Sequence, residues 1–212
     1  MGAPSCLAMV LLAVSAAMAL SYDPGHVIEL ARKHYGTKGV RAIESWQAML
    51  SKESGQPEEA LLKAVNKYWN RTVMAGEDIY VWKQKDYWAT PLQTLVKGAG
   101  DCEDYVIGKY FSLLKLGVAP DKLRLIYVKA RLGRQSVAHM VLGYYPSPDA
   151  DPLVLDSLVD SIRPASRRND LTPVFSFNAQ GVYVAGAMRT SVDRIGRWRT
   201  LVSKMRGEGF EP

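Results

Sequence analysis

The chain has 212 residues, of which 48% are apolar, so it can bury a substantial core and we expect one domain. Its formal net charge of +6 implies at most an affinity for anionic surfaces. The sequence has no aromatic and basic RNA-binding signature, no Gly-rich phosphate loop and no internal repeat, which argues against nucleic acid and nucleotide binding.

The first residues are typical of a targeting segment. No charged side chain precedes Asp23, an apolar run extends from Leu7 to Leu20, and small residues at Ala17 and Ala19 suit a signal peptidase. We therefore predict a signal peptide over residues 1–19, a domain over 20–212 and export of the chain; an uncleaved apolar leader is the alternative. The run is shorter than the ~20 apolar residues of a comfortable membrane span, and Cys6 lies too near the start for a lipoprotein acceptor.

The segments before the second cysteine read as scaffold. Apolar residues recur at helical spacing over 24–36, 39–53 and 57–75, which predicts three amphipathic helices. His26 and His34 lie in the first of them and are expected at the solvated surface. Trp82 and Trp88 follow; both are expected in the core or a pocket wall, and Trp88 is also a candidate for lining a substrate cleft.

Cys102 stands out because it is the only cysteine left after the predicted cleavage, in a compartment where thiols are usually paired. Such a residue indicates a reactive thiol or an intermolecular bond, whereas the alternative is a buried small hydrophobic residue. Its neighbours favour reactivity, since the stretch GAGDCEDY places it between acids and behind two glycines.

A helix is predicted with Cys102 in its first turn and Gly117 as its C-terminal stop. Unpaired N–H groups and the positive dipole end in its first turn would stabilise a thiolate and could bind an oxyanion. Asp101 is a candidate N-cap, with Asp104 completing a box-like pair. The three nearby carboxylates would oppose the dipole and raise the pKa of the thiol.

A base and an acid follow on two predicted strands. His139 lies in the strand SVAHMVLGYY, after a strand over 123–130, and Asp156 lies in LVLDSLV. If Pro146 to Asp149 form the hairpin loop, Tyr145 faces Ala150 and His139 faces Asp156, close enough for the carboxylate to hold the imidazole. A slip of one residue would abolish this contact. A histidine on an apolar strand is otherwise more often a core residue.

The C-terminal part is again scaffold. Residues 163–173 are predicted to form a polar loop with solvated basic charges, and short strands are expected over 173–177 and 181–185. Residues 193–207 predict a basic helix that packs on the domain, with partner or membrane contact as the alternative.

A helix-borne Cys followed by His and Asp on successive strands is the order of papain-like and transglutaminase-like thiol enzymes. The segments WATPLQTLVKGAGDCEDYVIGKYFSL, VAHMVLGYY and LVLDSL resemble the bacterial transglutaminase-like cysteine proteinases, and within them the LapG-type periplasmic proteases that release biofilm adhesins. The resemblance runs from roughly Val27 to Arg206, and DCEDY is its most distinctive part. A visible departure is Gly108, where we would expect alanine.

The resemblance implies an α+β fold in which N-terminal helices and a catalytic helix pack on an antiparallel sheet. It implies Cys102 as nucleophile, His139 as general base and then acid, and Asp156 as the residue that orients the histidine. It also implies calcium, with Asp101, Glu103 and Asp104 as ligands.

As partners, the resemblance implies a large repeat-containing surface adhesin cut in its N-terminal region and an inner-membrane cyclic di-GMP receptor that sequesters the protease. No nucleic acid partner is expected. Two alternatives stay open: a transglutaminase-like enzyme that transfers amides to amines, and a catalytically silent periplasmic binding module.

Overall fold

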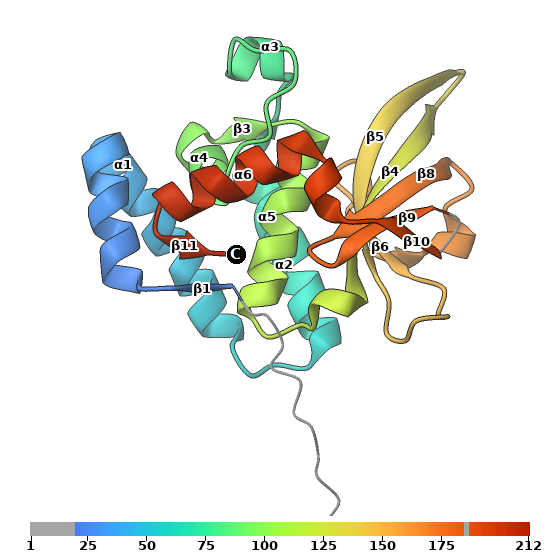
Figure 1. The fold of residues 1–212 in the computed structure, drawn as a ribbon, viewed down its shortest axis with the longest axis horizontal. Helices are drawn as coiled ribbons and strands as arrows, with labels where there is room; N and C mark the ends of the chain where they lie inside the picture. The colour runs from blue at the N-terminus through green and yellow to red at the C-terminus, as the bar shows by residue number, and fades with distance from the viewer. Residues whose placement is uncertain (1–19, 185–186) are drawn as a thin grey trace, which may run out of the picture.

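The structure is a computed structural model that describes residues 20–184 and 187–212 (Figure 1). The predicted signal peptide, residues 1–19, lies outside the described residues. Helices and strands follow in a mixed order. The helices are α1 (Pro24–Glu53), α2 (Glu58–Thr72), α3 (Asp78–Val81), α4 (Pro91–Lys97), α5 (Cys102–Lys115) and α6 (Gly196–Gly207), with short 3₁₀ turns η1 (Pro120–Lys122), η2 (Ala165–Arg167) and η3 (Val192–Arg194). The strands are β1 (Ser21–Tyr22), β2 (Met74–Ala75), β3 (Ala99–Gly100), β4 (Leu123–Leu132), β5 (Gln135–Tyr144), β6 (Leu153–Leu155), β7 (Arg163–Pro164), β8 (Leu171–Asn178), β9 (Gly181–Val184), β10 (Ala187–Thr190) and β11 (Phe210–Glu211).

One antiparallel sheet carries most of the strands of the domain. Within the described residues it has seven strands in the order β10-β9-β8-β4-β5-β6-β7. Figure 1 shows the helices gathered on one side of this sheet, with α5 between the other helices and the strands. The predicted α+β architecture is therefore confirmed.

The N-terminal helices follow the predicted pattern with one adjustment. The predicted helices 24–36 and 39–53 form a single element, α1, which is broken at Gly36 where φ is +60° and ψ is −151°. Glycine tolerates this backbone conformation because it has no Cβ. The third predicted helix is shorter than expected: α2 ends at Thr72, because Val73 is extended and residues 74–75 form strand β2.

The catalytic helix of the prediction, α5, is the centre of the core. It begins at Cys102 and ends at Lys115, and Gly117 follows at φ +89°, as predicted for a helix stop. Every residue from Asp104 to Leu114 is buried, because α2 and α4 cover one side of the helix and the sheet covers the other.

Close packing between α2 and α5 explains the glycine at position 108. A Cβ on Gly108 would lie 2.4 Å from Cη2 of Trp69, so the alanine expected from sequence does not fit. The indoles of Trp46 and Trp69 both donate hydrogen bonds to Ser112 Oγ, at 2.8 and 2.9 Å. These bonds satisfy the buried indole N–H groups. They also fix α1, which carries Trp46, and α2, which carries Trp69, against α5.

The C-terminal part confirms most of its predictions. Helix α6 packs on the domain through Trp198, Leu201 and Met205, and Trp198 stacks on Phe111 with ring centroids 5.8 Å apart. The predicted strand 173–177 lies within β8, and the predicted strand 181–185 matches β9 up to Val184, residue 185 being outside the described residues. The loop predicted over 163–173 is partly wrong, because β7 and η2 lie in it and β8 begins at Leu171.

Candidate active site

The start of α5 is held by a short parallel pairing of strands. Residues Ala99 and Gly100 of β3 pair with Met74 and Ala75 of β2, so the chain reaches the helix in extended form. Asp101 occupies the N-cap position with extended backbone, and Cys102 is the first helical residue. The predicted placement of the cysteine in the first turn is confirmed.

Cys102 is partly buried. Its Sγ donates to Glu103 Oε2 at 3.1 Å. Burial, and next the negative charge of Glu103, raise the pKa of the thiol well above its ordinary value, while the Met140 backbone N–H acts in the opposite direction. The rise caused by neighbouring carboxylates was predicted, whereas burial, the larger cause, was not. In this state the sulfur holds its proton at neutral pH and needs a base to remove it.

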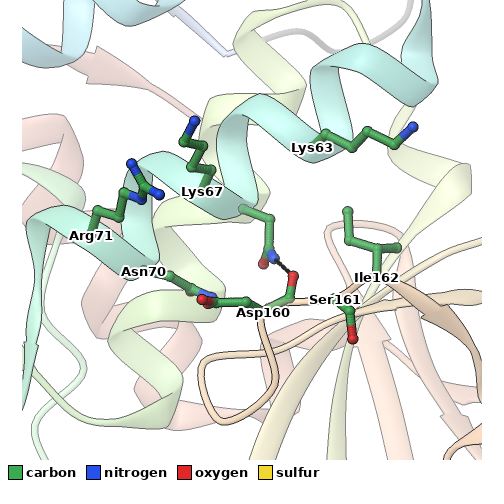
Figure 2. Close-up of a pocket in the computed structure, with 8 residues that line it drawn as sticks. Lys63, Lys67, Asn70, Arg71, Asp160, Ser161 and Ile162 are labelled. Carbon is green, nitrogen blue, oxygen red and sulfur yellow. Dashed lines mark hydrogen bonds between the residues drawn. The ribbon is translucent and has the colours of Figure 1, made fainter.

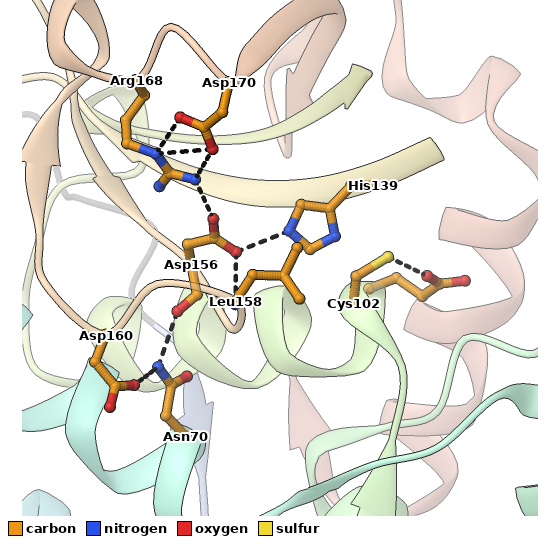
Figure 3. A network of polar contacts seen from close by, with 9 residues as sticks. Asn70, Cys102, His139, Asp156, Leu158, Asp160, Arg168 and Asp170 are labelled. Carbon is orange, nitrogen blue, oxygen red and sulfur yellow. Dashed lines mark hydrogen bonds and ion pairs between the residues drawn. The ribbon is translucent and has the colours of Figure 1, made fainter. Parts of the chain in front are cut away.

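His139 and Asp156 form a buried pair. The imidazole Nε2 lies 2.7 Å from Asp156 Oδ1, with the histidine 5% exposed and the aspartate fully buried. Figure 3 shows His139 between Asp156 and Cys102, with its ring directed at the thiol. The structure thus brings together the three residues singled out from the sequence.

The strand register that was used to predict this pair is wrong by two residues. Tyr144 faces Leu153 and Leu142 faces Leu155, so the loop is longer than the predicted four residues and Asp156 follows the end of β6. A shift of two keeps every side chain on its original face, because side chains alternate with a period of two. The Asp156 side chain therefore still lies on the face that carries His139.

Arg168 is a site residue that the sequence analysis missed. It was placed in a solvated loop, but it is only 3% exposed and its Nη2 donates to Asp156 Oδ2 at 2.7 Å (Figure 3). Burial alone raises the pKa of Asp156, but hydrogen bonds from His139, the Leu158 backbone and Arg168 outweigh it and lower that pKa to about 2. The neighbouring Arg163 and Arg167 are exposed, as predicted.

Helix α2 supports the segment that follows Asp156. The Asn70 side-chain amide donates to Asp156 O at 2.8 Å and to Asp160 Oδ1 at 2.7 Å, and the Asn66 amide donates to Asp160 O at 2.9 Å. Asn70 and Asp160 both line a surface pocket of about 460 Å³, and Figure 2 shows their side chains pointing toward each other. Asp156 is thus held by its main chain as well as by its carboxylate.

A cluster of carboxylates lies beside the nucleophile. Asp78, Asp101 and Asp104 each offer a ligand atom, and these atoms lie within 4.8 Å of one another. Each of the three has a buried oxygen without a hydrogen-bond partner among the described residues: Asp78 Oδ1, Asp101 Oδ1 and Asp104 Oδ2. Gly100 permits the approach, because a Cβ there would lie 2.5 Å from Asp104 Oδ2.

The electrostatics of this cluster favour a cation. Burial, followed by the charges of Glu103 and Asp104, raises the pKa of Asp101 to about 10, and burial raises that of Asp104 to about 8. The pKa of Asp78 is also raised, again chiefly by burial. Buried carboxylates that repel one another and leave oxygens free suit a hard cation with oxygen ligands.

The capping interpretation of the acids is right for the position of Asp101 and wrong for its hydrogen bonding. Asp101 is at the N-cap position, but its side chain makes no capping hydrogen bond, and Asp104 Oδ1 instead accepts from the Ala89 backbone N–H at 2.9 Å. Both residues are therefore available to the cluster. Glu103 joins an adjacent group with Asp78 and Asp86, and also contacts the thiol.

The other residues singled out from the sequence lie at the surface or in the core. His26 and His34 are exposed, as predicted. Trp88 is buried at 3% exposure, stacks on Phe177, and lines a pocket of about 690 Å³ together with Arg197 of α6. A helix long and apolar enough to cross a bilayer is not found in the described part of the chain.

Comparison of the chain with known proteins identifies similar sequences and structures. A family model described as bacterial transglutaminase-like cysteine proteinase matches residues 39–170. A solved structure of Legionella pneumophila LapG is 36% identical to the chain and superposes with a TM-score of 0.75, covering 86% of this chain and 97% of that one.

Two further structures of Legionella pneumophila LapG are similar to the chain. The EGTA-treated form is 35% identical to the chain, with a TM-score of 0.76, and the match covers 86% of this chain and 97% of that one. The calcium-bound form is 36% identical, with a TM-score of 0.74, and the match covers 86% of this chain and 99% of that one. A search of curated proteins gave no match. With a matching family model over more than half of its length and these solved relatives, the chain belongs to the bacterial transglutaminase-like cysteine proteinases.

Proposed function

We propose that this chain is a periplasmic, calcium-dependent cysteine endopeptidase that cuts the N-terminal region of a large cell-surface adhesin and thereby releases it from the cell. The observation that carries the proposal is the pair formed by His139 Nε2 and Asp156 Oδ1, 2.7 Å apart, with the imidazole directed at Cys102 (Figure 3). Membership of a cysteine proteinase family supports the same chemistry.

The three residues have distinct roles in this proposal. His139 takes the proton of the Cys102 thiol, and the sulfur attacks the scissile carbonyl to form a tetrahedral oxyanion. When the intermediate collapses, His139 gives the proton to the leaving amine and an acyl-thioester remains on Cys102. Water then attacks the thioester, His139 accepts its proton, and the thiol is regenerated as the acid product leaves. Asp156 keeps the imidazole in one orientation throughout.

Calcium is proposed to bind at the acid cluster beside the nucleophile. Asp78, Asp101 and Asp104 would hold it through the oxygens that lack a hydrogen-bond partner among the described residues, and Glu103 lies in an adjoining acidic group. The ion would supply positive charge where buried carboxylates repel one another. Asp101 and Asp104 belong to the ligand set expected from the resemblance, and Asp78 is an addition that only the structure provides.

The cellular setting rests on the resemblance. The substrate would be a repeat-containing adhesin, release would promote biofilm dispersal, and an inner-membrane cyclic di-GMP receptor would sequester the protease. These partners remain part of the proposal.

The decisive experiment uses residues 20–212 and a purified N-terminal region of a candidate adhesin encoded near this gene. Wild type should cut it in the presence of calcium, and Cys102→Ala should remove cleavage with an almost unchanged melting temperature. Cleavage by Cys102→Ala at the wild-type rate would exclude the mechanism.

Two added reagents separate the alternatives. Incorporation of a labelled amine into the substrate without cleavage would favour amide transfer. Ordinary reactivity of Cys102 toward a thiol-directed reagent, together with no cleavage, would favour the silent binding module.

A further inference from the structure

Arg168 connects two carboxylates from different parts of the chain. It follows the turn η2, and its Nη2 donates to Asp156 Oδ2 and to Asp170 Oδ2, both at 2.7 Å. Its Nε also donates to Asp170 Oδ1 at 3.0 Å. The resulting fork fixes the plane of the guanidinium, since two of its nitrogens are bound to one carboxylate.

The contact with Arg168 completes the surroundings of the Asp156 carboxylate. Asp156 Oδ1 accepts from His139 Nε2 and from the Leu158 backbone N–H at 3.0 Å, and Oδ2 accepts from Arg168. With both oxygens engaged, rotation about the bond to the carboxylate would break at least one charge-assisted hydrogen bond. The oxygen that faces His139 is therefore fixed by a partner on the opposite oxygen.

Other charged groups near Asp156 do not replace Arg168. Lys109 of α5 is fully buried, and its Nζ has no hydrogen-bond partner among the described residues. Burial lowers the pKa of Lys109 to about 7, so it is only partly charged at neutral pH. Asp160, on the segment after Asp156, is negatively charged and cannot pair with the Asp156 carboxylate. His139 is the group that Asp156 orients, so it cannot also fix the orientation of Asp156.

We propose that Arg168 is a positioning residue of the active site: together with Asp170 it holds the Asp156 carboxylate turned so that Oδ1 faces His139. This inference rests on the proposed function of the Cys102, His139 and Asp156 triad. Arg168 touches neither Cys102 nor a reacting atom in this role, and acts through Asp156.

The test compares Arg168→Met, Arg168→Lys and Asp170→Asn with a matched control, Arg167→Met, which removes an exposed arginine one residue away. Activity is measured as kcat and KM on a peptide substrate. We expect Arg168→Met to lower kcat roughly ten- to hundredfold with little change in KM, because a small misplacement of a catalytic group has effects of this size. Arg168→Lys should recover part of kcat, Asp170→Asn should cause a smaller loss, and Arg167→Met should resemble wild type.

A second readout separates positioning from a purely structural role. The titration of the Asp156 carboxyl, followed by carbon NMR in protein labelled at aspartate, should move to higher pH in folded Arg168→Met and stay in place in Arg167→Met. A kcat within twofold of wild type, or an unchanged Asp156 titration, in folded Arg168→Met would overturn the inference. If Arg168→Met does not fold, the same two outcomes are applied to Arg168→Lys and Asp170→Asn.

The carboxyl titration also distinguishes the two proposals. If wild type cleaves no peptide, the proposed protease function fails on its own evidence. A shifted Asp156 titration in the variant would then still support the hold of Arg168 on this carboxylate, and an unshifted one would refute it.

Discussion

Asp78 and Asp104 come from separate segments of the chain, yet their carboxylates lie in one cluster with Asp101, within 4.8 Å of one another. The parallel pairing of β2 with β3 creates this relationship, because it brings the segment before α3 alongside the segment before α5. Gly76 N–H donates to Gly100 O at 2.9 Å and extends the pairing to the edge of the cluster. The relationship predicts a cation site that uses two stretches of sequence.

Removing the cation should destabilise the protein. We expect EGTA to lower the melting temperature and abolish cleavage, and added calcium to restore both, because the ion relieves repulsion among buried carboxylates. Differential scanning calorimetry and a cleavage assay check this result. An identical melting temperature with EGTA and with calcium would contradict a bound ion in this cluster.

Asp78→Asn should weaken calcium binding by about tenfold or more, because it removes one charged ligand from the cluster. The matched control is Glu77→Gln, which removes an exposed neighbouring carboxylate and should leave the affinity close to that of wild type. Asp86→Asn tests the adjacent group with Glu103. Isothermal titration calorimetry gives the affinities, and a larger effect of Asp86→Asn than of Asp78→Asn would move the site to that group.

Asp156 should make the folded state sensitive to acid. Its pKa is about 2 in the folded state and about 3.9 in an unfolded chain, so its stabilisation is complete above pH 5 and is lost as the pH falls toward 2. The shift corresponds to about 2–3 kcal/mol. In urea unfolding between pH 7 and pH 2, Asp156→Asn should therefore lose less stability than wild type by about this amount. Parallel curves for the two proteins would exclude the predicted linkage.

The three proposed catalytic residues should act as a unit. His139→Ala should lower kcat about as much as Cys102→Ala, and Asp156→Asn should leave a small remainder because it misorients the base without removing it. The double variants should be no worse than the more damaging single variant. Additive losses in kcat would argue against a shared catalytic function.

Gly108→Ala should destabilise the domain by about 1–3 kcal/mol, because its Cβ would overlap the indole of Trp69 and force α2 and α5 apart. Gly207→Ala is the control, since no atom lies within 4 Å of a Cβ at that end of α6. Urea unfolding measures both variants. Equal stability of Gly108→Ala and wild type would show that the Trp69 side chain moves aside without cost.

Local patterns in the sequence were sufficient to predict much of the scaffold and the candidate residues. Apolar spacing and Gly117 predicted α5 with Cys102 in its first turn, and alternating residues predicted the strand that carries His139. Even the hairpin register, wrong by two residues, left Asp156 on the correct face because side chains alternate along a strand.

Only the tertiary structure decided which distant groups complete the site. Arg168 reads as one more cation in a polar loop, and Asp78 as one more exposed acid, because neither has a periodic or local signal of burial. The pairing of β2 with β3 brings Asp78 beside Asp101. The fold of the segment after β7 brings Arg168 beside Asp156. The sequence determined which residues could do chemistry. Non-local packing, which local periodicity does not report, determined which carboxylate oxygens lack a hydrogen-bond partner among the described residues and which carboxylate is held by an arginine.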